Sequence, residues 1–209
     1  MDRLSFGPIG ERARHLCIDM QRLFAPGGPW PTPWMERVLP VVASLAERYV
    51  ERTIFTRFIP PRRPEDMPGT WQHYYRRWHE VTLEKLDPAM LELVPPLADL
   101  ASRARVVDKP TYSAFATSDL TLLLHEQGVD TLIVTGAETD VCVLATVLGA
   151  VDRGYRVIVV TDAICSSTDE GHDALLGRYC NRFAQQIETA TSATILERDR
   201  KSTRLNSSH

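Results

Sequence analysis

The chain has 209 residues, of which 44% are hydrophobic and 24% charged, the composition of an ordinary globular domain. Its net charge of −3 excludes the strongly basic surface of a protein that binds nucleic acid or an anionic membrane. No apolar run approaches the roughly 20 residues of a membrane span, and the first residues, MDRLSFGPIGERARH, lack a hydrophobic secretion signal. We therefore expect a cytoplasmic protein without nucleic-acid or membrane partners.

Short runs rich in β-branched residues alternate with helical patterns along the chain. The runs are apolar without strict alternation, which is typical of parallel strands covered on both faces. We therefore expect one α/β domain over residues 1–198, an open six-stranded, mostly parallel sheet with helices on both faces, in a Rossmann-like three-layer sandwich. In chain order the predicted elements are strand Arg14–Asp19, helix Glu36–Val50, strands Arg52–Phe58 and Ala104–Lys109, helix Asp119–Gln127, strand Asp130–Gly136, helix Cys142–Arg153, strand Arg156–Ala163, helix Asp169–Thr189 and strand Ser192–Glu197.

The last residues of the chain, DRKSTRLNSSH (199–209), are polar and have no apolar period. They resemble the in-frame translation of a common sequencing-library adapter, so we expect a non-native addition. The alternative is a disordered native tail. The functional interpretation is the same in both cases.

The connection between the second and third predicted strands is long. It begins with the proline-rich stretch PPRRPEDMPG and continues with WQHYYRRW. The aromatic residues Trp71, Tyr74, Tyr75 and Trp78 have the i, i+3, i+4, i+7 spacing of one helical face. This face can pack within the protein or at a subunit contact, or it can belong to a lid over the substrate. Stacking on nucleic acid is the third alternative, and the overall charge disfavours it.

The cysteines show neither CxxC spacing nor a paired histidine pattern, so we expect free thiols. Cys142 is distinctive because it follows a predicted strand in TGAETDVCVL. Thr139 or Asp140 can cap a helix there, which would place Cys142 in its first turn. A helix N-terminus stabilises an anion by about 0.3–1 kcal/mol, and by up to about 2 kcal/mol when partly buried. Cys165 also follows a strand, but no apolar helix comes after it.

Three chemically distinct side chains lie at the carboxyl ends of predicted strands: Asp19, Lys109 and Cys142. In open α/β sheets ligands bind at this edge, so we expect the three to converge. The Lys109 ammonium would lower the pKa of the thiol. The Asp19 carboxylate would raise it, and therefore fits better as the acceptor of the thiol proton. Taken singly, each residue also has an ordinary structural interpretation: a turn aspartate, an exposed lysine and a small buried hydrophobe.

These residues lie in CIDMQ, VVDKPTYSAF and GAETDVCV, which together resemble the motifs of the isochorismatase-like cysteine hydrolases over about residues 14–196. The resemblance implies a six-stranded parallel sheet and a catalytic triad, with Asp19 as base, Lys109 as electrostatic partner and Cys142 as nucleophile. Family members typically form dimers or tetramers, so we expect a homodimer or homotetramer. The resemblance also implies a cis peptide bond between Ala137 and Glu138, and an oxyanion hole formed by the backbone N–H groups of Glu138 and Cys142.

Departures from the family pattern narrow the expected activity. Nicotinamidases in this family carry an Asp-x-His metal motif after the second strand, where this chain has TRFIPP. We therefore expect no metal, no cofactor and no nicotinamidase activity. The intact triad favours a metal-independent amidohydrolase that cleaves a small amide, carbamoyl or ureido compound through a thioester. An isochorismatase-type vinyl ether hydrolase and a non-catalytic binding homologue are the alternatives. The expected substrate-binding residues are Phe24, Trp30, Trp71, Tyr75 and Tyr112.

Overall fold

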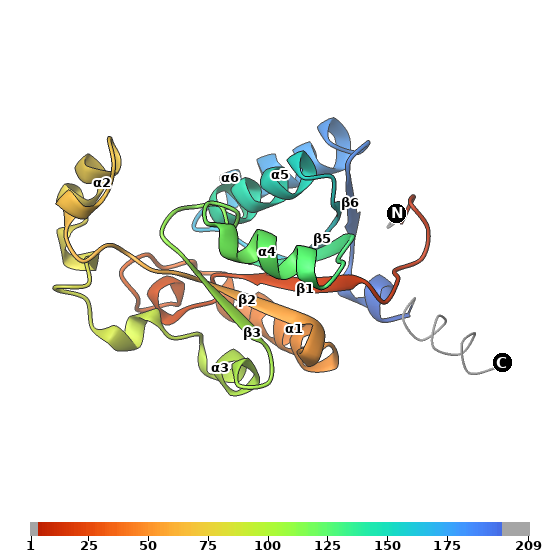
Figure 1. Cartoon of the computed structure of the whole chain (residues 1–209), viewed down its shortest axis with the longest axis horizontal. Helices are drawn as coiled ribbons and strands as arrows, with labels where there is room; N and C mark the ends of the chain where they lie inside the picture. The colour runs from red at the N-terminus through yellow and green to blue at the C-terminus, as the bar shows by residue number, and fades with distance from the viewer. Residues whose placement is uncertain (1–3, 198–209) are drawn as a thin grey trace.

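A computed structural model describes residues 4–197 of the chain, and the predicted tail at 199–209 lies outside this range (Figure 1). All six strands are parallel and form one open sheet in the order β3-β2-β1-β4-β5-β6. The prediction of an open parallel α/β sheet is therefore confirmed. The strands are β1 (Ala13–Ile18), β2 (Thr53–Phe58), β3 (Arg105–Lys109), β4 (Thr131–Ala137), β5 (Arg156–Cys165) and β6 (Ile187–Ala190).

Helices cover both faces of the sheet, as predicted (Figure 1). They are α1 (Met35–Arg48), α2 (Trp71–Arg77), α3 (Pro95–Ala101), α4 (Ser118–Glu126), α5 (Leu144–Asp152) and α6 (Asp169–Gly177). Buried side chains of α1 and α3 pack on one face of the strands, and those of α4 and α5 pack on the other. Because successive strand residues point to opposite faces, continuously apolar strands such as β4 contribute to both cores.

The strand order reverses between β1 and β4, which are neighbours in the sheet but far apart in the sequence. Gly136 permits their close approach at the carboxyl end. Its φ is +110°, and a Cβ atom there would collide with the backbone of Ile18. This reversal creates the crevice in which open α/β folds bind their ligands.

The C-terminal part of the sheet differs from the prediction. Residues 192–197, predicted as the last strand, are helical, and the sixth strand lies earlier, at Ile187–Ala190. The predicted helix Asp169–Thr189 is α6 followed by a π-helical turn, Arg178–Arg182. Glu188 lies within the predicted helix Asp169–Thr189, but in the structure it belongs to β6. Its buried carboxylate instead pairs with Arg156 on β5 at 2.6 Å, which offsets the cost of burying the charge.

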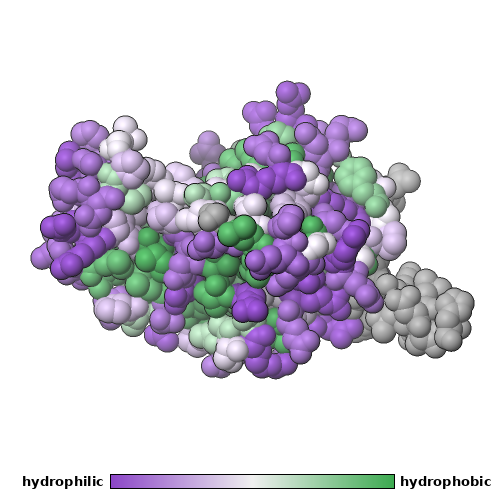
Figure 2. Space-filling model, viewed as in Figure 1, coloured by the Kyte–Doolittle hydropathy of each residue, from purple (hydrophilic) through white to green (hydrophobic). Residues whose placement is uncertain are grey.

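The long connection after β2 forms a segment that extends beyond the sheet and carries α2 at its far end (Figure 1). Figure 2 shows polar side chains over much of α2 and apolar side chains between it and the middle of the molecule.

Two of the exposed large apolar side chains are Val106 on β3 and Leu122 on α4. Among the helices within residues 4–197, none is long and apolar enough to cross a bilayer. The expected homodimer or homotetramer stays a prediction.

Candidate active site

Asp19 follows β1 directly and lies at the point where the strand order reverses. Its φ is +48°, a left-handed conformation that aspartate adopts more easily than most residues. Its backbone N–H donates to the carbonyl of Thr56, at 3.2 Å. The hydroxyl of Thr56 donates to Asp19 Oδ1 at 2.6 Å, so β2 fixes the orientation of the carboxylate. The other oxygen, Oδ2, is buried and accepts no well-aligned hydrogen bond from the described residues, although it contacts a cation.

That cation is Lys109, the last residue of β3. Strand β2 separates β3 from β1, so the side chain must cross about 10 Å of sheet to reach Asp19. It does so beside the ring of Phe58, whose centroid lies 5.0 Å from Nζ. Nζ then lies 2.7 Å from Asp19 Oδ2 and donates to the carbonyl of Thr111 at 2.9 Å. Both charged side chains are 0% exposed, so only a long cation on this edge strand completes the pair.

Cys142 lies in a π-helical turn, Thr139–Val143, that leads from β4 into α5. This differs from the prediction of a first α-helical turn capped by Thr139 or Asp140, because the capping position is Glu138 and α5 begins only at Leu144. The π-helical turn adds residues between strand and helix, and π-bulges of this kind are frequent at functional sites. The thiol is 4% exposed and borders a cavity.

The three side chains meet, as the positions of the strand ends predicted. The Cys142 thiol is electrostatically coupled to both Asp19 and Lys109. Burial and the Asp19 carboxylate raise the pKa of Cys142 well above its ordinary value, and Lys109 opposes this only in part. Burial lowers the pKa of Lys109, but Asp19 and Cys142 raise it by more, so the amine stays charged. The cluster therefore consists of a thiol with a raised pKa beside the Asp19–Lys109 ion pair.

Both expected effects on the thiol are present: Lys109 lowers the pKa of Cys142 and Asp19 raises it, and burial raises it further. About 1.4 kcal/mol is needed for each unit by which a pKa falls, and a helix terminus supplies at most about 2 kcal/mol. At Cys142 such a contribution would have to offset both burial and the neighbouring carboxylate, which raise the pKa of the thiol. Of the two charged side chains next to the thiol, Asp19 is the one that can accept a proton.

The peptide bond between Ala137 and Glu138 is cis, at the position where the family resemblance implies it. The turn that follows is held by residues beyond β5. Ser166 donates to Asp140, and the Tyr179 hydroxyl donates to the Thr139 carbonyl at 3.3 Å. These contacts fix the backbone that carries the N–H groups of Glu138 and Cys142.

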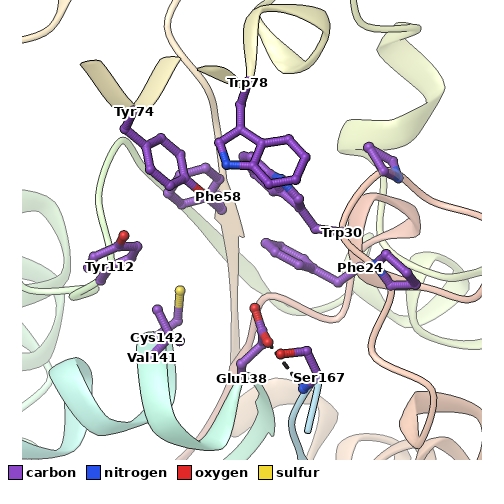
Figure 3. A pocket seen from close by; sticks show the side chains of 12 residues that line it. Phe24, Trp30, Phe58, Tyr74, Trp78, Tyr112, Glu138, Val141, Cys142 and Ser167 are labelled. Atoms are coloured by element: carbon purple, nitrogen blue, oxygen red, sulfur yellow. Dashed lines mark hydrogen bonds between the residues drawn. The ribbon is translucent and has the colours of Figure 1, made fainter. Parts of the chain in front are cut away.

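A cavity of about 280 Å³ opens beside Cys142 (Figure 3). Its volume is near the low end for small-molecule sites, which are about 300–1,000 Å³. Half of the side chains around it are aromatic, and Glu138 and Ser167 lie across the cavity from Tyr74 and Trp78. The residues that line it are Phe24, Pro29, Trp30, Pro31, Phe58, Tyr74, Trp78, Tyr112, Glu138, Val141, Cys142 and Ser167.

The predicted pocket residues fall into two groups. Phe24, Trp30 and Tyr112 line the cavity. Trp71 and Tyr75 do not, because they stack on each other on a different stripe of α2, with ring centroids 6.0 Å apart. The aromatic pair that reaches the cavity is Tyr74 and Trp78, separated by one helical turn. The spacing of the four aromatic residues could have suggested two such stripes, but it could not show which one faces the site.

Phe58, Glu138 and Ser167 also line the cavity and were not predicted as substrate-binding side chains. Phe58 is the last residue of β2, and the sequence singled it out only as the end of that strand. The sequence singled out Glu138 only for its backbone, although a carboxylate close to Cys142 could have indicated a role for its side chain. Ser167 follows β5, and nothing in the sequence relates it to Cys142.

A metal centre of the nicotinamidase type does not fit this chain. At the end of β2 and directly after it lie Phe58, Ile59 and Pro60, which offer neither carboxylate nor imidazole. Within residues 4–197, no group of at least three His, Cys, Asp or Glu side chains is placed to hold a metal ion. The absence of a metal from the reaction stays a prediction.

Comparison with known proteins gives a consistent result. The model of the isochorismatase domain matches residues 14–191. The chain is 36% identical to nicotinamidase 3 of Arabidopsis thaliana over 184 residues, which are 87% of each protein. It is 30% identical to maleamate amidohydrolase of Pseudomonas putida over 174 residues, covering 80% of this chain and 79% of that protein. A shorter match, 38% identical, to an uncharacterized isochorismatase family protein of Bacillus subtilis covers 39% of this chain and 44% of that protein.

The fold is also shared with solved structures. A cysteine hydrolase from Pseudomonas syringae pv. phaseolicola superposes with a TM-score of 0.81 and 25% sequence identity, covering 94% of this chain and 97% of that one. The family model and this superposition both span nearly the whole described chain. The chain therefore belongs to the isochorismatase family.

Proposed function

We propose that the chain is a cysteine amidohydrolase that cleaves a small amide, carbamoyl or ureido compound through a thioester on Cys142. The observation that carries this proposal is the contact among Asp19, Lys109 and Cys142 beneath an aromatic cavity. Each residue comes from a different strand end, and each has the chemistry that acyl transfer needs.

In the first half-reaction the thiol proton moves to Asp19 Oδ2 as Cys142 Sγ attacks the amide carbonyl carbon. Backbone N–H groups of Glu138 and Cys142 stabilise the resulting oxyanion. The proton on Asp19 then passes to the departing nitrogen, the C–N bond breaks, and ammonia or a small amine leaves. The product on the enzyme is a thioester.

In the second half-reaction a water molecule attacks the thioester, and Asp19 accepts its proton. The C–S bond breaks as the tetrahedral intermediate collapses, the acid leaves, and the proton returns to Cys142. Lys109, which is paired with Asp19 at 2.7 Å, stabilises negative charge on sulfur during both halves. The net reaction converts one amide and one water into an acid and an amine.

The names of the relatives support an amide over a vinyl ether, since they include a maleamate amidohydrolase and a nicotinamidase. A non-catalytic homologue is the second candidate, and one relative from Arabidopsis thaliana, 31% identical, is described as a probable inactive nicotinamidase. The cavity beside Cys142 favours catalysis, because a substrate has room to reach the thiol.

A panel of small carboxamides, carbamoyl compounds and ureido compounds tests the proposal by ammonia release. The protein is first dialysed against a chelator, because we expect activity without metal. Release by the wild type, but not by Cys142→Ala, is the expected result. Activity that disappears on chelation and returns with zinc or manganese would contradict the metal-independent mechanism. A vinyl ether that is cleaved when no amide is would contradict the amidohydrolase assignment.

Replacing Lys109 with methionine is expected to slow alkylation of Cys142 by iodoacetamide at pH 7, with recovery at higher pH. The ammonium lowers the pKa of the thiol, so its loss raises that pKa, and a rise of one unit makes thiolate about tenfold rarer. Methionine approximates the volume of the side chain, while Asp19 loses its ion-pair partner, so a urea denaturation curve must show that the variant folds. Peptide mass mapping assigns the rate to Cys142. Identical rates in both proteins from pH 6 to 9 would rule out the electrostatic role.

A further inference from the structure

Six of the twelve residues that line the Cys142 cavity are aromatic, and five of these rings pack against one another. Trp30 is central: its ring lies 5.7 Å from that of Trp78 and 5.9 Å from those of Tyr74 and Phe58 (centroid distances). Phe24 stacks on Trp30 at 6.0 Å. These mutual contacts hold the rings in place before any ligand binds. Such a wall attracts either a flat apolar group or a cation, because the face of an aromatic ring carries partial negative charge.

The charge of the cavity distinguishes these two ligands. Of the described residues that line it, Glu138 has the one acidic side chain, and no lysine, arginine or histidine is among them. Asp19 and Lys109 lie beneath Cys142, but they neutralise each other as a fully buried pair. A ligand in the cavity therefore meets aromatic faces and a single negative charge that has no cationic partner along the lining.

The carboxylate of Glu138 is directed toward the cavity (Figure 3). It accepts a hydrogen bond from the backbone N–H of Ser167 at 3.1 Å, which fixes its position without neutralising its charge. The side chain is half-buried and acts electrostatically on both Tyr74 and Tyr112, which border the same cavity. A carboxylate oriented in this way beside aromatic rings matches the general chemistry of sites for alkylated ammonium groups.

We propose that the cavity selects a small amide that carries an alkylated ammonium group, with the cation held between Glu138 and the rings of Trp30 and Trp78 while the amide carbon reaches Cys142. This inference rests on the proposed amidohydrolase function and names its substrate class. Maleamate carries a carboxylate, and an anion of that kind would meet Glu138 with no cation to offset the repulsion. The chain is therefore expected to discriminate against carboxylate-bearing amides.

Three amides of matched shape test the charge preference: 4-(trimethylammonio)butanamide, its neutral isostere 5,5-dimethylhexanamide, and glutaramate, which has a carboxylate in place of the quaternary group. Homologues with shorter and longer methylene spacers accompany each one. We expect kcat/KM for the best cationic amide to exceed that of its neutral isostere by about 10- to 100-fold, with the anionic amide slower still. Nicotinamide serves as the flat, neutral aromatic comparison.

Glu138→Gln is expected to reduce the cation-to-neutral ratio of kcat/KM about tenfold, because it removes the charge and keeps the shape. The ratio is the readout because the Glu138 backbone also belongs to the proposed oxyanion hole. Glu80→Gln is the matched control. Its side chain is 87% exposed beyond α2, so the ratio should stay at the wild-type value.

Direct binding separates failure of this inference from failure of the amidohydrolase proposal. Calorimetry with Cys142→Ala measures the affinity for the cationic and neutral amides without turnover. Tighter binding of the cation supports the inference even if no amide is hydrolysed by the wild type, an outcome that would overturn only the amidohydrolase proposal. The cationic substrate class would be overturned if the cation bound no more tightly than the neutral amide. It would also be overturned if the enzyme preferred to turn over the neutral isostere, glutaramate or nicotinamide.

Discussion

Replacing Cys142 with alanine is expected to lower kcat for amide hydrolysis by about 10³-fold or more, while the protein remains folded. Without the sulfur no thioester can form, and removal of a covalent nucleophile typically has an effect of this size. The substitution removes a single buried atom beside an open cavity, so only a modest change in the free energy of unfolding is expected. Ammonia release measures the first effect and urea denaturation the second.

Cys165→Ala is the matched control for this prediction. Cys165 is also buried at a strand end, and burial raises its pKa to about 12, but it lies outside the cavity that Cys142 borders. Its replacement should change turnover little. Comparable losses in both variants would show that packing around the site, rather than a nucleophilic thiol, accounts for the effect.

Asp19→Asn is expected to lower kcat by about 10³-fold, nearly as much as loss of the cysteine, because general bases contribute about 10²–10⁴. Asparagine has the same shape, tolerates the left-handed backbone and can still accept the hydrogen bond from Thr56. What it cannot do is accept and return a proton. The loss should not add to that of Cys142→Ala in the double variant, since the two residues act as a unit.

The same variant separates proton transfer from simple electrostatics. The Asp19 carboxylate raises the pKa of Cys142, so its neutralisation should lower that pKa and accelerate alkylation of the thiol. Turnover should nevertheless fall. If the Asp19→Asn variant kept turnover within tenfold of the wild type, this result would contradict the proposal that Asp19 is the general base. Alkylation and turnover that fall together would show that Asp19 only positions the thiol.

Much of the sheet could be predicted because its strands are continuously apolar. Strands such as β4 are buried throughout, and a buried parallel strand has this composition regardless of sequence context. β6 was misplaced for the opposite reason. Its charged residue, Glu188, is stabilised by Arg156 from a neighbouring strand, and a pairing between distant residues leaves no local pattern.

The convergence of Asp19, Lys109 and Cys142 could be predicted because the carboxyl ends of parallel strands share one edge. The raised pKa of the Cys142 thiol could not be predicted in this way. It depends on how deeply the cluster is buried, and the sequence gives no measure of that burial. The aromatic wall shows the same limit: the spacing of Trp71 and Tyr74 predicts a helix, but the rotation of α2 about its axis decides which ring meets the substrate.

The central claim is that an acyl group from the substrate becomes attached to Cys142. Turnover of the best amide is stopped with acid in the first catalytic cycles, and the peptides are analysed by mass spectrometry. We expect the peptide that contains Cys142 to gain the mass of the substrate minus ammonia, and to lose it on treatment with hydroxylamine. An acyl group on a different residue, or undiminished turnover by protein whose Cys142 is fully alkylated, would contradict the mechanism.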